Sequence, residues 1–257
     1  MSNLEAFDLT GKTALITGGN TGIGLGIAKG LARSGAKVAI HGRDETKLTQ
    51  ACKEIADMGG EAIAAPFDLE DNESLPAAYA QVSERLGGVD VLVNNAGMQC
   101  RGRADQIALN DFNRILKVNL TAPYVLSQCY ARERIAEGKE GSLILIASLM
   151  SEASRPTTSP YTATKGAIRQ LVKAFAVDWA DFGIRVNGIG PGYIQTGMTQ
   201  PLLDKPDFDA WVKQRTPLGR WGQPQDFEGA ATFLASNASR FITGQIIYVD
   251  GGWLATF

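Results

Sequence analysis

Two side chains that could exchange a proton with a substrate lie four residues apart. Tyr161 and Lys165 share one face of the chain if their segment is helical. An ammonium group beside a phenol lowers the phenol pKa from its usual value of about 10. A tyrosine tuned in this way can act as a base in alcohol oxidation and as an acid in ketone reduction.

A hydroxyl that could hold a substrate oxygen follows an apolar segment. Ser148 comes directly after the run Leu143–Ala147, so we expect it at the carboxyl edge of a sheet. There it could hydrogen-bond the reacting oxygen. Each residue also has an ordinary alternative role: a Tyr–Lys pair can be a solvated surface pair, and a serine after a strand can cap a helix.

The first turn of the chain is rich in glycine. Residues 17–24 are Thr-Gly-Gly-Asn-Thr-Gly-Ile-Gly, which follow a predicted strand and open a predicted helix. Glycine lets the backbone turn tightly and approach a pyrophosphate, and the N-terminus of the next helix points N–H groups at the anion. The spacing departs from GxGxxG, but the position predicts dinucleotide binding.

Short apolar runs that must position these residues alternate with helical patterns. The runs are apolar on both faces, which is typical of parallel strands covered by helices on each side. They predict an α/β fold with a doubly wound parallel sheet in three α/β/α layers, in one domain of residues 1–257. Residues 193–222 include a stretch without a strand, and we expect a small helical lid there. The predicted strands are 13–17, 37–41, 62–67, 89–94, 143–148, 184–189 and 245–250.

The composition excludes several other kinds of site. The chain has 257 residues and a formal net charge of -2, so no overall field recruits nucleic acid or an anionic membrane. The single histidine, His41, cannot form a two-histidine zinc site, and we expect no bound metal. Cys52, Cys100 and Cys129 form no CxxC pair, and this usage fits a reducing cytoplasm. The first ten residues do not resemble a secretory signal, and no apolar run is long enough to span a bilayer.

An ordered set of motifs resembles the short-chain dehydrogenase/reductase family. The motifs are the glycine-rich turn at 17–24, Asn-Asn-Ala-Gly at 94–97, Asn119, Ser148, Tyr161-x-x-x-Lys165 and Pro-Gly-Tyr-Ile-Gln-Thr at 191–196. The resemblance implies a Rossmann-type domain with seven parallel strands, assembled as a homotetramer. It also implies nicotinamide-dependent oxidation of an alcohol or reduction of a ketone.

The resemblance carries over to individual residues. It implies catalytic roles for Asn119, Ser148, Tyr161 and Lys165, with Asn119 holding a water that links Lys165 to solvent. An interior asparagine can instead bond the backbone. Lys165 would also hold the nicotinamide ribose. The predicted cofactor-binding residues are Gly18, Asn20, Thr21, Gly22, Ile23, Gly24, Arg43, Asp68, Leu69, Asn95, Ala96, Gly97, Tyr161, Lys165, Pro191, Gly192, Ile194 and Thr196.

The end of the second strand favours NADP(H) over NAD(H). An NAD enzyme of this type carries an acid there for the ribose hydroxyls, whereas this chain has Gly42 followed by Arg43. Arg43 could bind a 2′-phosphate through a charge-assisted pair. NAD(H) stays possible because Asp44 is one residue away, although Asp44 could also cap the next helix. His41 could stack on adenine or simply finish the strand.

Three further segments resemble those family members that act on sugar acids. They are residues 95–101, 151–167 and 215–223, and they imply interconversion of D-gluconate and 5-keto-D-gluconate. Cys100 departs from that pattern, in which a second basic residue is expected, so the exact acid stays open. Arg101 and Arg155 could bind the substrate carboxylate, or they could form surface ion pairs or contact another subunit. Gln99 could bind a sugar hydroxyl. The predicted substrate-binding residues are Gln99, Arg101, Ser148, Arg155 and Tyr161.

Three alternatives remain from the sequence. The substrate could be a related deoxyketogluconate or a 3-oxoacyl group on its carrier protein, and the protein could be a non-catalytic NADP sensor. A carrier-protein reductase needs a basic surface for its acidic partner, which the net charge does not indicate. A sensor would more readily have lost the Tyr–Lys pair, which is intact.

Overall fold

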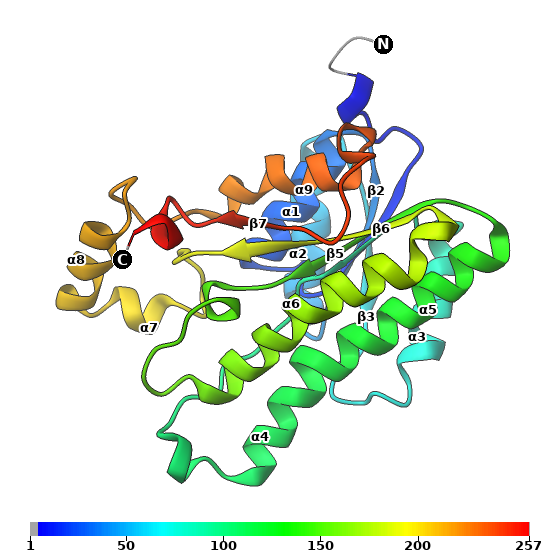
Figure 1. Cartoon of the computed structure of the whole chain (residues 1–257). Coiled ribbons are helices and arrows are strands. Elements are labelled where there is room, and N and C mark those ends of the chain that lie inside the picture. The colour runs from blue at the N-terminus through cyan, green and yellow to red at the C-terminus, as the bar shows by residue number, and fades with distance from the viewer. Residues whose placement is uncertain (1–4, 257) are drawn as a thin grey trace.

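Seven short apolar strands form one parallel sheet in the computed structural model, which describes residues 5–256 (Figure 1). Residues 1–4 and 257 of the predicted domain lie outside the described residues. The order β3-β2-β1-β4-β5-β6-β7 confirms the predicted doubly wound fold. The strands are β1 Thr13–Ile16, β2 Lys37–Gly42, β3 Glu61–Pro66, β4 Val91–Asn94, β5 Gly141–Ile146, β6 Ile184–Pro191 and β7 Ile246–Val249.

Helices cover both faces of this sheet, which explains why the strands are apolar throughout. Within β1, Leu15 packs toward one helical layer, while Ala14 and Ile16 pack toward the other. The first layer contains α3 Leu75–Leu86, α5 Ala122–Glu137 and α6 Ser159–Trp179, with α4 Leu109–Leu116 preceding α5. The second contains α1 Gly22–Arg33, α2 Glu45–Asp57 and α9 Glu228–Ala235. The predicted three-layer arrangement is therefore confirmed.

The segment after β6 is helical, as predicted, and lies beside the carboxyl ends of β6 and β7 (Figure 1). It contains α7 Gln200–Leu203 and α8 Pro206–Arg215. A single bridge between Ile194 and Gly222 joins its two ends, close to the predicted limits of 193–222. Rings of Tyr193, Phe208, Trp211, Trp221 and Trp253 pack against one another and give this segment a small core of its own.

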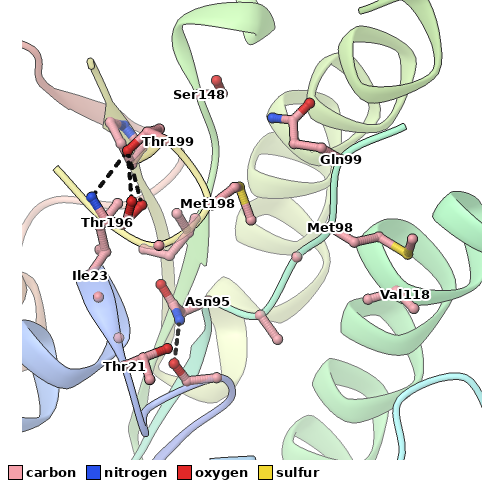
Figure 2. A pocket seen from close by; sticks show the side chains of 18 of the residues that line it. Thr21, Ile23, Asn95, Met98, Gln99, Val118, Ser148, Thr196, Met198 and Thr199 are labelled. Atoms are coloured by element: carbon pink, nitrogen blue, oxygen red, sulfur yellow. Dashed lines mark hydrogen bonds between the residues drawn. The ribbon is translucent and has the colours of Figure 1, made fainter. Parts of the chain in front are cut away.

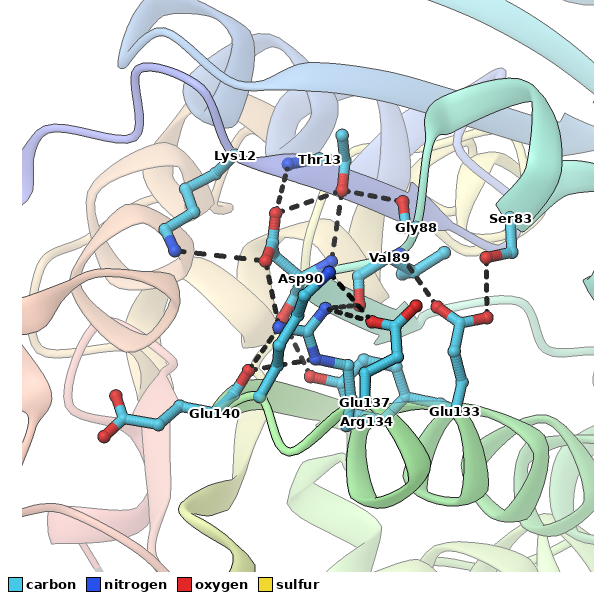
Figure 3. Close-up of polar contacts among 12 residues, drawn as sticks. Lys12, Thr13, Ser83, Gly88, Val89, Asp90, Glu133, Arg134, Glu137 and Glu140 are labelled. Carbon is cyan, nitrogen blue, oxygen red and sulfur yellow. Dashed lines mark hydrogen bonds and ion pairs between the residues drawn. The ribbon is translucent and has the colours of Figure 1, made fainter.

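At the amino ends of β4 and β5, many contacts hold a group of charged side chains (Figure 3). Arg134 is 3% exposed and donates to the Glu140 carbonyl and to Asp90 Oδ1, the latter at 3.2 Å. Tyr130 Oη donates to the Asp90 carbonyl at 2.8 Å. Glu133 accepts from the backbone N–H of Val89. These contacts fasten α5 to the loop before β4.

Of the helices in residues 5–256, none combines the length and apolarity that crossing a bilayer requires. The same part of the chain contains no cluster of three or more His, Cys, Asp or Glu side chains that could hold a metal ion.

Candidate active site

A cavity of about 800 Å³ opens at the carboxyl ends of the central strands. It lies where the chain order reverses around β1, which is the place where doubly wound sheets bind ligands. Figure 2 shows Thr21 and Ile23 of the glycine-rich turn on one side, and Met98 and Val118 on the other. With the exception of Asn119, every predicted catalytic, cofactor-binding and substrate-binding residue lines this cavity.

The glycine-rich turn passes closely over the start of α1. A Cβ at Gly24 would lie 2.2 Å from the Gly18 carbonyl oxygen, so no larger residue fits there. Asn95 Nδ2, from the loop after β4, donates to the carbonyls of Thr17 and Gly18 at 2.9 and 3.1 Å. Thr21 precedes α1 and makes no side-chain cap. The first N–H groups of α1 therefore face the cavity and suit a phosphate.

His41 finishes β2 and supports this turn. Its Nδ1 accepts from the Gly18 N–H at 3.0 Å, so its Nε2 carries the proton that is donated to the Phe67 carbonyl at 3.0 Å. Its ring packs on that of Phe67, with 3.9 Å between centroids. Burial lowers the pKa of His41 to about 4. His41 therefore finishes the strand, which is one of its two predicted roles, and it also lines the cavity.

The end of β2 has the features expected of an adenosine site. A Cβ at Gly42 would lie 2.4 Å from the Asn20 amide nitrogen, so an acid at this position would have to displace the Asn20 side chain. Asp44 caps α2 by accepting from the Lys47 N–H at 3.0 Å, which is the second of its two predicted roles. Arg43 remains largely exposed and lies 3.5 Å from Glu70 Oε1.

Tyr161 and Lys165 lie on the first turns of α6 and both face the cavity, as predicted. Lys165 is 4% exposed, and its Nζ lies 5.6 Å from the centre of the Tyr161 ring. This Nζ donates to the Ile146 carbonyl at 2.6 Å. Burial lowers the pKa of Lys165 to about 8. The pair is therefore in the cavity rather than on a solvated helix face.

The expected effect of Lys165 on the pKa of Tyr161 is wrong for this chain. Burial raises the pKa of the Tyr161 phenol, while a hydrogen bond from Ser148 and the charge of Arg101 partly oppose this. Lys165 is not among the groups that lower this pKa, and its Nζ donates to the Ile146 carbonyl instead. The phenol is thus held in its protonated, proton-donating form.

Ser148 lies two residues beyond the last residue of β5, because the strand ends at Ile146 rather than at the predicted residue 148. Its Oγ faces Tyr161 and also accepts from the Met150 N–H at 3.1 Å. Ser148 therefore caps the short turn Leu149–Ser151, which was its alternative role, and still presents its hydroxyl to the cavity. One oxygen serves both purposes.

Asn119 lies at the centre of a π-helical turn, Lys117–Thr121, between α4 and α5. Its Oδ1 accepts from the Met98 N–H at 2.8 Å, and its Nδ2 donates to the Met98 carbonyl at 2.9 Å. The side chain therefore bonds the backbone, which was its alternative role, and does not line the cavity. It fixes the loop that carries Gln99 and Arg101, and π-helical turns are frequent at functional sites.

Two arginines reach the cavity without an anionic partner. Within residues 5–256, neither the Arg101 nor the Arg155 side chain forms an ion pair, and both line the cavity. Burial and the charge of Arg155 lower the pKa of Arg101. The Arg155 guanidinium lies 5.1 Å from the centre of the Phe208 ring on α8. Among the described residues, nothing donates to the buried Gln99 Oε1.

Several cavity residues could not be found from the sequence. Arg114 projects from α4 and donates twice to Glu70, at 2.9 and 2.7 Å, so α4 brings a second arginine to the adenosine end. No motif marks Arg114, because its position depends on how α4 packs against the sheet. Other lining residues that were not predicted include Lys47, Glu70, Tyr193, Thr199 and Leu202.

Comparison with known proteins identifies the family. The family model adh_short_C2, described as "Enoyl-(Acyl carrier protein) reductase", matches residues 18–254. Gluconate 5-dehydrogenase of Gluconobacter oxydans (strain 621H) is 42% identical over 252 residues, which cover 98% of this chain and 98% of the relative. 5-keto-D-gluconate 5-reductase of Escherichia coli (strain K12) is 41% identical over 250 residues, which cover 97% and 98%.

A solved structure agrees with these relatives. It is that of a gluconate 5-dehydrogenase from Burkholderia cenocepacia J2315, in complex with NADP and tartrate. The match covers 99% of each chain, with 44% identity and a TM-score of 0.94. The motifs, the sheet order and these matches agree along nearly the whole chain. The chain therefore belongs to the short-chain dehydrogenase/reductase family and is an oxidoreductase that acts on CH–OH groups.

Proposed function

We propose that this protein is an NADP(H)-dependent oxidoreductase that interconverts D-gluconate and 5-keto-D-gluconate. The observation that carries the proposal is the arrangement of one cavity. This cavity is lined by the glycine-rich turn and Arg43, by Tyr161, and by Arg101 and Arg155. The same cavity thus offers a dinucleotide site, a proton donor and positive charge for an acidic substrate.

The turn suits a dinucleotide because it brings backbone close to the cavity without side chains in between. The close approach at Gly24 and the uncapped start of α1 leave room and N–H donors for a pyrophosphate. Asn95, Ala96 and Gly97 would line the nicotinamide half from the β4 side, with Pro191, Gly192, Ile194 and Thr196 opposite. A bound NADP(H) would supply or accept the hydride.

The choice of NADP(H) over NAD(H) rests on charge at the end of β2. No acid occupies position 42, and the Asp44 carboxylate is engaged at the start of α2. Arg43 would bind the 2′-phosphate, and Asp68 and Leu69 would line the adenine. Arg114 neutralises Glu70, which would otherwise repel a phosphate. The NADP found in the Burkholderia cenocepacia structure supports this choice.

Tyr161 would handle the proton. In ketone reduction its Oη donates a proton to the substrate oxygen, and in alcohol oxidation it accepts one. Its raised pKa keeps the phenol protonated near neutral pH, which favours reduction. Ser148 would hold the same substrate oxygen, and Lys165 would hold the nicotinamide ribose. Asn119 would act indirectly, because both ends of its amide bond Met98 in the loop that carries Gln99 and Arg101.

An anionic sugar satisfies the two arginines. Burial and the charge of Arg155 lower the Arg101 pKa, and a carboxylate between the two arginines would offset that charge. Gln99 Oε1 would accept from a sugar hydroxyl, since nothing among the described residues donates to it. The names of the Gluconobacter oxydans and Escherichia coli relatives point to C5 of gluconate as the reacting carbon.

The direct test mixes the purified protein with NADPH and 5-keto-D-gluconate and follows the absorbance of the reduced nicotinamide. We expect oxidation of NADPH with this substrate, and reduction of NADP+ with D-gluconate. A deoxyketogluconate in the same assay separates the closely related alternative. Turnover of acetoacetyl thioesters with inert sugar acids would overturn the proposal in favour of a carrier-protein reductase. NADPH binding without turnover on any of these would favour a sensor.

We also infer a homotetramer in the cytoplasm, which follows from the family likeness and the cysteine usage. Exposed apolar side chains on the α4, α5 and α6 layer, namely Leu109, Tyr124 and Val177, would suit contacts between copies. Light scattering of the purified protein tests the assembly, and a monomer mass would contradict it.

A further inference from the structure

The turn that carries Ser148 is fastened to helix α6 by three contacts. Lys165 Nζ reaches back to the Ile146 carbonyl at 2.6 Å, just before the turn. Ser151 Oγ donates to the Lys165 carbonyl at 2.9 Å. Glu152 Oε1 lies 2.7 Å from Arg169 Nε, one helical turn beyond Lys165. The turn and the helix are therefore held in one register on both sides of Ser148.

Glu152 also contacts the edge strand. Tyr248 Oη on β7 donates to Glu152 Oε1 at 2.8 Å. The Tyr248 ring lies directly against β6, because a Cβ at Gly190 would be 2.3 Å from it. Burial and the hydrogen bond to Glu152 raise the pKa of Tyr248, so the phenol stays a donor. One carboxylate therefore joins the turn after β5 to α6 and to β7.

We propose that Glu152 is a positioning residue: by holding Arg169 and Tyr248 together, it fixes the turn that carries Ser148 against the helix that carries Tyr161. Glu152 does not line the cavity and would touch neither substrate nor cofactor. Its loss would change the distance between the Ser148 and Tyr161 hydroxyls, which would both bind the substrate oxygen. Small displacements of such groups are costly, since misplacement by about 1 Å can reduce a rate by about 10²-fold.

The contact between Glu152 and Arg169 is too exposed to matter mainly for stability. Their side chains are 32% and 35% exposed, and ion pairs of this kind contribute little to folding. The same is true of Lys29 on α1 and Glu54 on α2, which lie 2.7 Å apart with side chains 22% and 34% exposed and do not line the cavity. This second pair is a matched control.

The test compares Glu152→Ala, Glu152→Gln and Glu54→Ala with the unmodified protein. Because the inference rests on the proposed function, the substrate is any ketone that the unmodified protein reduces with NADPH. We expect kcat to fall about tenfold in Glu152→Ala, with an unchanged KM for NADPH and an unchanged thermal midpoint. Glu152→Gln keeps an acceptor for Tyr248 and should recover part of the rate. Glu54→Ala should match the unmodified protein.

The pH profile of alcohol oxidation separates positioning from a general structural effect. The Ser148 hydrogen bond lowers the Tyr161 pKa, so a displaced turn should move the rising limb of the profile to higher pH. Other charged or titratable groups share the cavity with Tyr161: Lys165 on its own helix, Arg101 after β4, Arg155 after β5 and Tyr193 after β6. Substitution of Glu152 leaves all of them in place.

A double substitution identifies the route of the effect. If Glu152 acts through Ser148, adding Glu152→Ala to Ser148→Ala should change kcat by less than twofold. Full additivity would overturn the inference, and so would a Glu152→Ala protein whose kcat and pH profile equal those of Glu54→Ala. If Glu152→Ala does not fold, the same comparisons apply to Glu152→Gln and Tyr248→Phe. An unmodified protein that reduces no ketone would instead remove the proposed function.

Discussion

Arginine side chains have different partners at the amino ends of the strands, here called the amino edge, and at their carboxyl ends, the carboxyl edge. At the amino edge, Arg134 is buried and bonded to Asp90 and to the Glu140 carbonyl (Figure 3). At the carboxyl edge, Arg101 and Arg155 form no ion pair with any residue of the described chain. A buried charge without partners is costly, so the amino edge is satisfied within the protein. The cavity arginines instead remain available to a ligand.

The difference separates residues that hold the fold from residues that hold a substrate. Contacts at the amino edge are complete before any ligand arrives, so a substitution there should change stability. At the carboxyl edge the unpartnered groups share one cavity with Tyr161, so a substitution there should change kinetics. Each of the following substitutions can break or sharpen this division.

Tyr161→Phe should have the largest effect, because it removes the proton donor and leaves the cavity shape intact. We expect kcat to fall about 10³-fold, the middle of the range for general acid–base catalysis. The affinity for NADPH, measured by nicotinamide fluorescence, should stay the same. Turnover close to that of the unmodified protein would contradict the role of Tyr161.

Arg134→Ala should reverse this pattern. Removing one partner from a buried ionic group costs about 3–5 kcal/mol, so the urea midpoint should fall clearly. In the protein that remains folded, kcat and both KM values should stay the same, since Arg134 is at the far edge of the sheet. A kinetic effect as large as the loss of stability would break the comparison.

His41 sharpens the comparison because it lies at the carboxyl edge but is fully bonded. Its pKa of about 4 in the folded chain is below its ordinary 6.5, so the unfolded chain binds more protons between these values. The neutral ring therefore contributes stability above pH 6.5 that is lost as the pH falls toward 4. We expect the unmodified protein to lose about 2 kcal/mol more than His41→Asn between pH 7 and pH 5. Parallel pH curves for urea unfolding would show that His41 is not buried and neutral.

Arg43→Ala should have the smallest effect, because Arg43 is largely exposed and its contact is screened by solvent. We expect KM for NADPH to rise about tenfold and KM for NADH to stay the same. Lys53→Ala is a suitable control, since Lys53 is equally exposed on α2 and pairs with Asp57 away from the cavity. Equal changes for both cofactors would remove the NADP(H) assignment.

The strands could be predicted because they are largely apolar on both faces. This pattern is visible in the sequence and does not depend on how each helix packs. The glycine-rich turn, Tyr161 and Lys165 could be predicted because their spacing is local. The surroundings of these residues could not. The Tyr161 pKa depends on burial, on the hydrogen bond from Ser148 and on the charge of Arg101, which the four-residue spacing does not specify.

Contacts between segments that are distant in the chain could not be predicted from the sequence either. Arg114 reaches Glu70 across 44 positions, and Glu152 reaches Tyr248 across 96. The side chain of Asn119 bonds Met98 because a π-helical turn places it there, and no pattern in the sequence marks that turn. These features follow from tertiary packing, which residue types and spacing do not determine.

The most direct test of the account compares 5-keto-D-gluconate with L-sorbose, in which CH₂OH replaces the carboxylate at C1. We measure kcat/KM for both in the unmodified protein, Arg101→Ala, Arg155→Ala and Arg103→Ala. Arg103 is a control, since it pairs with Asp105 outside the cavity. We expect each cavity substitution to lower kcat/KM for the acid about 30-fold and to leave that for L-sorbose unchanged. Equal losses for both sugars, or no loss for the acid, would contradict the claim that the unpartnered arginines bind the substrate.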